Sequence, residues 1–291
     1  MPSRTRLSLM AFCSSGDRLS AYNWVALRFS KSMTGASSFL TSAALAAPSA
    51  APTRTPGTLV VGFGDPAVGF AVGTVRGSTI KNPKGYEVDL SKAIAKQLGI
   101  GTINYIYTPW AKLFAPGTKD FDISFQEATI TAARKKTVDF STPYLNANQG
   151  VLISKKAAAP KSLADLKQLQ TCAQTNTTGL DWIKTQLHPA KAPLAFPTTT
   201  AAYQAVQINR CDALILDVPL VSLQKKQKPA AYGPVAGQVV THEQYGAVLQ
   251  KGSKLLPIVN TTMKGLIKDG TLGKLQKKWF NIDFSKIPSL K

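Results

Sequence analysis

The chain is poor in the residues that most often carry catalysis and metal binding. It has 291 residues, among them 2 histidines, 3 cysteines and 15 acidic residues, against 35 lysines and arginines. No cysteine and histidine cluster has the spacing of a metal site, so no metal or other cofactor is predicted. Neither His188 nor His242 lies near a nucleophile motif, and the lack of a Gly-x-Ser-x-Gly elbow argues against hydrolase chemistry. After residue 56, no apolar stretch is long enough to span a bilayer.

The chain does have enough apolar residues to fold, together with a large excess of positive charge. It is 44% hydrophobic and 17% charged, which predicts well-formed cores outside the chain ends. Its length suits two lobes. The net charge of +20 first suggests nucleic acid or an anionic surface as a partner. The lysines occur in scattered pairs without interleaved aromatic residues, so we predict no nucleic-acid partner and a solvated basic surface.

The N-terminus resembles an export leader, which we place at residues 1–47. A small and apolar run over 33–47 contains an Ala-x-Ala cleavage pattern at 44–46. The segment before this run is unusually long, so either translation starts nearer Met33 or the leader is atypical. We expect export to the periplasm or to the outer face of the cytoplasmic membrane, with 48–57 as a flexible tether.

The rest of the chain alternates short apolar strands with amphipathic helices, which is typical of α/β layers with mainly parallel sheets. Strands are predicted at 58–63, 103–107, 121–125, 150–154, 171–174, 213–216 and 246–249. Helices are predicted at 87–98, after 162, at 181–187, at 200–208, between 255 and 270, and through 279. We expect two lobes, 58–146 with 246–291 and 147–245, joined by crossings near 146–150 and 245–247.

Several short motifs in this part of the chain resemble one family. They are Gly-Tyr-Glu-Val-Asp-Leu at 85–90, Thr-Ile-Thr-Ala-Ala-Arg at 129–134, Val-Asp-Phe-Ser-Thr-Pro-Tyr at 138–144, Thr-Thr-Gly at 177–179, Arg-Cys-Asp-Ala at 210–213 and Gln-Tyr-Gly at 244–246. Their order over 58–280 is similar to that in the polar amino-acid-binding proteins of ABC importers, solute-binding protein family 3. The resemblance implies a two-lobed periplasmic-binding-protein fold of type II, each lobe a mainly parallel sheet flanked by helices. It also implies a monomer, not an enzyme, that captures a free basic or polar amino acid such as lysine, arginine or glutamine and delivers it to a membrane permease.

A free amino acid presents a carboxylate and an ammonium group on neighbouring atoms. The arginine fork suits the carboxylate, and an aspartate accepts hydrogen bonds from the ammonium. By the resemblance, Arg134 and Thr129 bind the carboxylate from the first lobe, and Asp217 takes the ammonium. Thr177 and Thr178 add donors from the second lobe. Contacts from both lobes would favour the closed state.

Three of these residues also have a purely structural interpretation. Arg134 opens an Arg-Lys-Lys run, and such a run is usually a solvated helix face. Thr178 could cap the helix that starts beside it, with or without a ligand contact. Asp217 stands before a Val-Pro pair and could cap the next helix. The surrounding motifs favour the ligand-binding interpretation in each case.

The part of the site that would contact the ligand's side chain is less regular. Trp110 aligns with an aromatic position that stacks over aliphatic ligand atoms, although core packing is an alternative. Asp65 follows the first strand, and Glu127 stands where the family usually has a small residue. Together they would favour a cationic side chain, whereas Glu127 could instead bond a glutamine amide or face solvent. The loop after the first strand lacks the usual aromatic spacing, so Phe63 or Phe70 is expected to replace that aromatic.

Cys172 and Cys211 are the cysteines that follow the predicted leader. An even pair in an exported protein suggests a disulfide, with two buried free thiols as the alternative. By the resemblance, the two residues lie on neighbouring strands of the second lobe. This favours a bridge that stabilises the lobe.

The main alternative function is a dehydratase of the cyclohexadienyl or arogenate type on the same scaffold. Such an enzyme needs a positioned general acid in its cleft, and Glu127 is the only obvious surplus carboxylate. The sequence over 177–179 keeps the binding-protein pattern, which favours binding without catalysis. A sensory module that acts through a partner is a further alternative.

Overall fold

The computed structural model describes residues 51–291. The predicted leader at 1–47 and the start of the predicted tether lie outside the described residues. From residue 51 the chain lies against the folded body, because Ala51 packs on the core and the backbone N–H of Arg54 donates to Asp122 at 2.6 Å. None of the helices in this part of the chain is long and apolar enough to cross a membrane.

The first sheet has seven strands in the order β2-β3-β4-β1-β5-β12-β6. They are β1 (Thr58–Phe63), β2 (Val72–Arg76), β3 (Thr79–Lys84), β4 (Thr102–Tyr107), β5 (Ile123–Ser124), β6 (Val138–Phe140) and β12 (Val248–Gln250). β1 pairs in parallel with β4 and β5, whereas the outer pairs are antiparallel. The sheet is therefore mixed, because a hairpin joins β2 to β3 and β12 enters from the second sheet.

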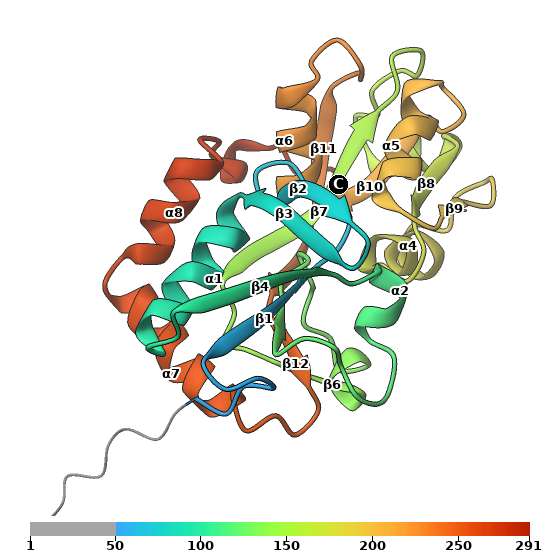
Figure 1. The fold of residues 1–291 in the computed structure, drawn as a ribbon. Helices are drawn as coiled ribbons and strands as arrows, with labels where there is room; N and C mark the ends of the chain where they lie inside the picture. The colour runs from blue at the N-terminus through green and yellow to red at the C-terminus, as the bar shows by residue number, and fades with distance from the viewer. Residues whose placement is uncertain (1–50) are drawn as a thin grey trace, which may run out of the picture. The chain divides into compact units, whose positions relative to one another are not determined.

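Helices α1 (Tyr86–Gln97), α7 (Leu256–Lys268) and α8 (Thr271–Trp279) pack on one another beside this sheet (Figure 1). Leu90 and Ile94 are four positions apart and so lie on one helical face, and both are fully buried. Gly85 precedes α1 at φ 142°, and a Cβ there would lie 2.0 Å from the carbonyl oxygen of Phe70. Only glycine fits this close approach of two backbone segments.

The second sheet has five strands in the order β11-β7-β10-β8-β9. They are β7 (Leu145–Ile153), β8 (Thr171–Gln174), β9 (Leu194–Phe196), β10 (Ala213–Asp217) and β11 (Val235–Tyr245). Its helices are α3 (Leu163–Gln168), α4 (Thr178–Trp182), α5 (Thr199–Gln207) and α6 (Val218–Gln227), and α4 continues as a π-helix over Ile183–Leu187. The predicted disulfide is confirmed: Cys172 on β8 bonds Cys211, just before β10, with 6.0 Å between their Cα atoms.

Strands β7 and β11 form the two crossings between the sheets. They pair antiparallel from Leu145 opposite Tyr245 to Leu152 opposite Val235, and Figure 1 shows them side by side between the two sheets. The C-terminal residues return to the second sheet, because Leu290 N–H donates to Gln238 O at 2.9 Å. The two sheets are thus tied by both crossings and by the tail.

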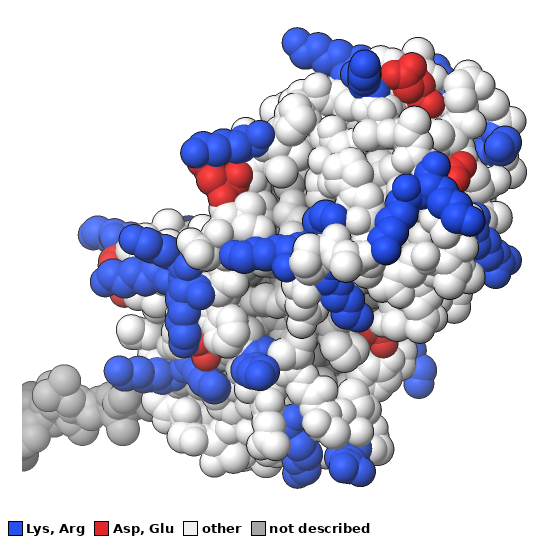
Figure 2. Space-filling view, turned by 90° about the horizontal axis from the view of Figure 1, so that it is seen from above, with Lys and Arg blue, Asp and Glu red and all other residues white. Residues whose placement is uncertain are grey.

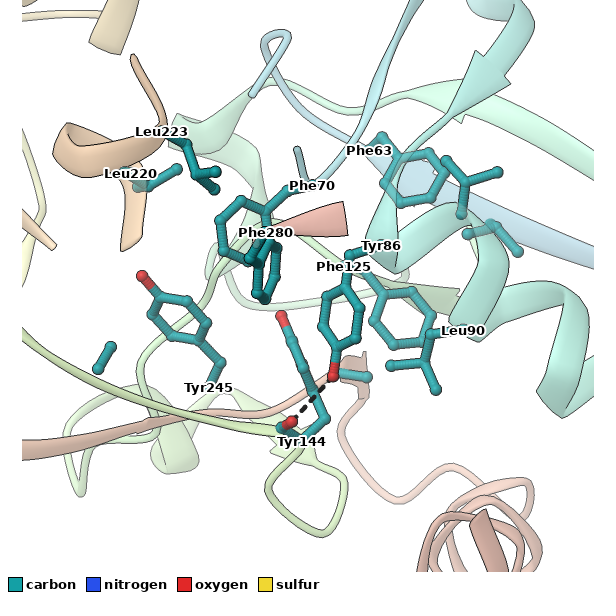
Figure 3. Packing of buried hydrophobic residues seen from close by; sticks show 14 of the residues in the cluster. Phe63, Phe70, Tyr86, Leu90, Phe125, Tyr144, Leu220, Leu223, Tyr245 and Phe280 are labelled. Atoms are coloured by element: carbon teal, nitrogen blue, oxygen red, sulfur yellow. Dashed lines mark hydrogen bonds between the residues drawn. The ribbon is translucent and has the colours of Figure 1, made fainter. Parts of the chain in front are cut away.

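A cluster of aromatic side chains fills the core between the first sheet and the crossings (Figure 3). The ring centroids of Phe70 and Phe280 lie 4.8 Å apart, and Tyr86 and Phe70 pack edge to face at 6.2 Å. The hydroxyl of Tyr86 donates to the carbonyl oxygen of Tyr144 at 3.0 Å, the bond drawn in Figure 3. This core fixes the base of the crossings, where Tyr245 is fully buried.

Basic side chains are spread over the surface. Figure 2, a view from above relative to Figure 1, shows lysine and arginine side chains separated by uncharged surface, with fewer acidic ones. Within residues 51–291, only three acidic residues form ion pairs with lysines: Asp89, which makes two, and Asp139 and Asp283, which make one each. The positive charge is therefore largely solvated.

Candidate ligand-binding site

A cavity of about 410 Å³ lies between the two sheets. Residues that follow the ends of β1, β5, β8 and β10 line it, together with side chains of α5 and α6. All eight residues predicted for the ligand site border this cavity: Asp65, Trp110, Glu127, Thr129, Arg134, Thr177, Thr178 and Asp217. The cavity stands at the carboxyl ends of parallel strands, where open α/β sheets commonly bind ligands.

Arg134 enters the cavity from the first sheet, on a 3-10 turn over Arg134–Lys136. Its guanidinium lies 4.2 Å from the ring centroid of Phe114 and 5.2 Å from that of Trp110. Nη1 donates to Thr129 O at 2.7 Å, and Nη2 donates to Asn176 O at 3.1 Å. The turn exposes Lys136 but directs Arg134 inward, which removes the solvated-face interpretation of this residue.

The guanidinium of Arg134 keeps its charge and part of its donor capacity. Burial lowers the pKa of Arg134 to about 10, against the opposing effect of Asp217 and Glu243, so the group is a cation at neutral pH. Two of its five N–H donors bind backbone oxygens. The remaining donors suit a planar carboxylate in the cavity.

Asp217 ends β10 and stands before α6 in the second sheet. Its side chain makes no capping hydrogen bond to α6, so the capping alternative is wrong. Instead Oδ1 accepts from Gln149 Nε2 at 2.6 Å and Oδ2 accepts from the hydroxyl of Tyr245. Burial, with the nearby charge of Glu243, raises the pKa of Asp217 to about 7. A carboxylate retains further lone pairs, which suit an ammonium group.

Thr177, not Thr178, is the N-cap of α4. The Thr177 hydroxyl accepts from Leu180 N–H at 3.3 Å and donates to Gln174 O at 2.7 Å. Thr178 is the first residue of the helix, which begins three residues before the predicted start at 181. The capping role predicted for Thr178 therefore belongs to its neighbour.

Glu243, on β11, is a polar residue of this region that sequence reasoning missed. Its Oε2 accepts from the hydroxyl of Thr129 at 2.8 Å and from that of Thr178 at 2.6 Å, and its Oε1 accepts from Gln149 at 3.0 Å. One carboxylate thus joins a residue beside the first sheet to a residue of the second. A threonine hydroxyl has a single hydrogen to donate. The hydroxyls of Thr129 and Thr178 donate theirs to Glu243, so in this structure neither is available to a ligand carboxylate. The available signal was a carboxylate two residues before Tyr245, in the predicted crossing.

Asp65 and Glu127 border the same cavity, and Glu127 does not face bulk solvent as one alternative had it. Asp65 accepts from the hydroxyl of Tyr107 at 2.9 Å. Glu127 has φ 49°, and its backbone N–H donates to Glu87 Oε1 at 3.1 Å.

The carboxyls of Glu87 and Glu127 both favour the protonated form. Glu87 is fully buried, and its Oε2 has no hydrogen-bond partner within residues 51–291. Burial raises the pKa of Glu87 to about 7, and burial together with the charge of Glu87 raises the pKa of Glu127 well above its ordinary value. The pair is therefore largely uncharged at acidic pH and gains negative charge as the pH rises.

The aromatic residues expected in the pocket divide into two groups. Trp110 borders the cavity and also packs against the cluster that contains Phe114, so both of its predicted roles are compatible with its position. Phe63 and Phe70 were expected to replace the missing pocket aromatic, and this is wrong. Their side chains are 2% and 0% exposed and belong to the aromatic core. Burial of these apolar rings in the core is favourable, so neither ring is available to contact a ligand.

The charged side chains that border the cavity indicate which kind of ligand it suits. Within residues 51–291, no three His, Cys, Asp or Glu side chains are arranged to coordinate a metal ion. A cation from the first sheet and a carboxylate from the second border one cavity. This pairing matches the two charges of a zwitterion.

Comparison with known proteins agrees with this geometry. The family model of the bacterial extracellular solute-binding proteins, family 3, matches residues 60–282. The L-cystine-binding protein TcyJ of Escherichia coli (strain K12) is 30% identical over 205 residues, covering 69% of this chain and 76% of the relative. A solved structure of an ancestral arginine-binding protein bound to glutamine matches with a TM-score of 0.69 and 31% identity, covering 79% of this chain and 100% of the other.

A second solved structure bears on the enzyme alternative. It is an ancestral amino acid-binding protein, a precursor of cyclohexadienyl dehydratase, with a TM-score of 0.67 and 35% identity. It covers 77% of this chain and 95% of its own, so binding proteins and the dehydratase scaffold are related. With a family model that spans most of the described residues, the chain belongs to the bacterial extracellular solute-binding proteins of family 3.

Proposed function

We propose that the protein captures one free amino acid in the cavity between its sheets and delivers it to an ABC permease in the membrane. The observation that carries this proposal is the pairing of Arg134 with Asp217 across the cavity. Arg134 would bind the ligand carboxylate, and Asp217 would accept from its ammonium. The α-carboxylate and α-ammonium, which all amino acids share, would thus be bound by one residue from each sheet.

Binding would close two lobes on the ligand. The first lobe comprises 58–146 and the segment from 246, and the second comprises 147–245 together with the tail bonded to β11. Because the two charged contacts come from different lobes, the ligand stabilises only the arrangement in which both are made. Glu243 supports this arrangement by joining Thr129 to Thr178.

The ligand would be a basic or polar amino acid, contacted by Trp110 along its side chain. Asp65 and Glu127 offer acceptors on one side of the cavity, which favours a side chain that carries hydrogen-bond donors. The names of the relatives, which bind cystine, arginine and glutamine, support this class. The protein would act as an exported, non-catalytic monomer stabilised by its disulfide.

Calorimetric titration tests the proposal. The oxidised protein from Pro48 onward would be unfolded, refolded to remove carried-over ligand, and titrated with each of the twenty common amino acids. Tight one-to-one binding of at least one of them is expected. If none binds, and the same preparation instead turns over prephenate or arogenate, the dehydratase alternative replaces this proposal.

A further inference from the structure

We propose that the cavity contains a second polar subsite, between α5 and α6, which binds the far end of a two-headed amino acid. The ligand class is an amino acid whose side chain ends in a second α-amino-acid group, as in a diamino dicarboxylic acid linked by a disulfide or thioether. The inference rests on the proposed function, because it assigns a ligand class to the same cavity.

The cavity extends well beyond the residues that would bind one amino-acid head. From Asp217 it continues past Tyr203 to Tyr232, whose ring centroids lie 5.9 Å apart. Its volume of about 410 Å³ corresponds to roughly 14 molecules of liquid water. A small amino acid held by Arg134 and Asp217 would leave this extension unfilled.

The extension is lined by amide, phenol and ammonium groups. They belong to Gln204, Gln207, Gln224, Gln227, Lys228 and Tyr232. Residues three or four positions apart on a helix lie on one face, so α5 and α6 each turn one polar face toward the cavity. Gln204, Gln227 and Lys228 are exposed to the cavity or to solvent, so these polar ends are accessible to a ligand.

Part of this hydrogen-bonding capacity is fixed and the rest is free. The amide nitrogens of Gln207 and Gln224 donate to the Tyr232 hydroxyl at 2.7 and 3.0 Å. The Tyr232 oxygen therefore accepts twice, and its own hydrogen is available to another acceptor. Lys225 donates to the carbonyl oxygens of Pro229 and Tyr232, which anchors the chain that follows α6. Within residues 51–291, the side-chain ammonium of Lys228 has no ion-pair or hydrogen-bond partner, although its backbone bonds Gln224 and Ala231.

These free groups match a zwitterion. The amide oxygens of Gln207 and Gln224 can accept from an ammonium group, while Lys228 and the Tyr232 hydroxyl can donate to a carboxylate. Among the residues that line this end, none is acidic, so an isolated cation such as a guanidinium would have no partner charge there. Between the two polar ends, Val68, Leu216 and Leu220 give the cavity an apolar middle. A two-headed amino acid has a zwitterion at each end and an apolar linker between them, which matches this sequence of polar, apolar and polar lining.

The test compares two-headed and one-headed amino acids by calorimetry. L-cystine and L-cystathionine would be titrated beside S-methyl-L-cysteine, L-glutamine and L-arginine. A two-headed probe is expected to bind at least tenfold more tightly than every one-headed one. Lys228→Glu should reduce that affinity at least tenfold and leave the affinity for S-methyl-L-cysteine within twofold. Lys191→Glu, an exposed charge reversal of the same size outside the cavity, is the matched control and should change neither.

Each other outcome contradicts a defined part of the account. Tighter binding of a one-headed amino acid, or an equal loss for both ligand types in Lys228→Glu, would overturn the subsite while the proposed function stands. Absence of binding by any amino acid would overturn the proposed function, and this inference with it. Gln204→Leu gives a second check, because Gln204 is exposed and its replacement spares the core; it should also weaken only the two-headed ligands.

Discussion

The two ends of the cavity differ in how firmly the protein holds its own polar side chains. Near Arg134, the charged side chains are already held by the protein: the guanidinium binds two backbone oxygens, and Asp217 accepts from Gln149 and Tyr245. Between α5 and α6, by contrast, Lys228 and several amide oxygens have no partner in the described chain. The end near Arg134, proposed to bind the common head group, is therefore preorganised. The end between α5 and α6, proposed to bind the ligand side chain, has polar groups that are still free.

This difference has a physical rationale. Side chains that are already fixed lose little conformational freedom when a ligand arrives, so binding costs less. The head group is the same in every amino acid, and a rigid set of partners suits it. Free amides and a lysine can adapt to one particular side chain, at the cost of ordering them.

The largest expected effect comes from removing the charge at the ordered end. Arg134→Ala should weaken the binding of every amino acid at least a hundredfold, about 2.7 kcal/mol, because the carboxylate loses its charged partner. Titration of the variant against the full set of amino acids measures this. Lys136→Ala, an exposed lysine of the same turn, is the control and should bind normally. Selective loss for some amino acids only would mean that Arg134 contacts side chains.

Asp217 should give the ordered end a pH dependence. Because its pKa is about 7 in the empty protein, and only the ionised form accepts fully from an ammonium, affinity should fall as the pH drops below 7, by up to about tenfold per pH unit. Asp217→Asn should bind ten- to a hundredfold more weakly at pH 8 and lose most of this dependence. Asp212→Asn, in the same sheet but outside the cavity, should retain it. A wild-type affinity that is flat from pH 5 to 8 would contradict the assignment.

The Glu87 and Glu127 pair should control how the stability of the empty protein depends on pH. In the folded chain both carboxyls hold protons that the unfolded chain has lost. Stability should therefore fall as the pH rises from about 4.5 to 7, by up to about 1.4 kcal/mol per pH unit for each group. Denaturant unfolding at pH 5 and pH 7.5 measures this slope. Glu127→Gln should flatten this slope and also change the preference among amino acids. An unchanged slope would contradict the raised pKa assigned to Glu127.

The smallest effect is expected at Glu243, which supports the ordered end without being assigned a ligand contact. Glu243→Gln leaves one acceptor oxygen for three donors, so affinity should fall about three- to tenfold and equally for all ligands. Gln244→Ala, on the same strand with its side chain exposed, is the control. A rise in affinity would mean that Glu243 competes with the ligand for the two threonine hydroxyls.

The sequence predicted the elements with a local signal and missed those that depend on distant partners. The helix over 87–98 and the strand at 58–63 follow from periodicity, and the capping pair Ser162 and Asp165 marks the start of α3 as observed. The hairpin of β2 and β3 was missed because its residues include charged, glycine and proline positions without regular alternation. Edge strands of this kind form through pairing with their neighbours.

The candidate site divides in the same way. Arg134 and Asp217 could be assigned by motif, and their position at one cavity agrees with that assignment. The coupling of Glu87 and Glu127 could not be assigned in this way, because the two residues are 40 positions apart and meet through a backbone turn at positive φ. Glu243 reaches Thr129 and Thr178 across 114 and 65 positions. Such contacts become visible only when the crossings are in place.

The most direct test of the central claim compares a free amino acid with its blocked forms. The tightest-binding amino acid would be titrated beside its N-acetyl derivative and its methyl ester, which remove the ammonium and the carboxylate charge respectively. If Arg134 and Asp217 together read the zwitterion, both derivatives should bind at least a hundredfold more weakly than the parent. If either derivative binds as tightly as the free amino acid, the residue assigned to the blocked group does not contact it, and the account of the site is wrong.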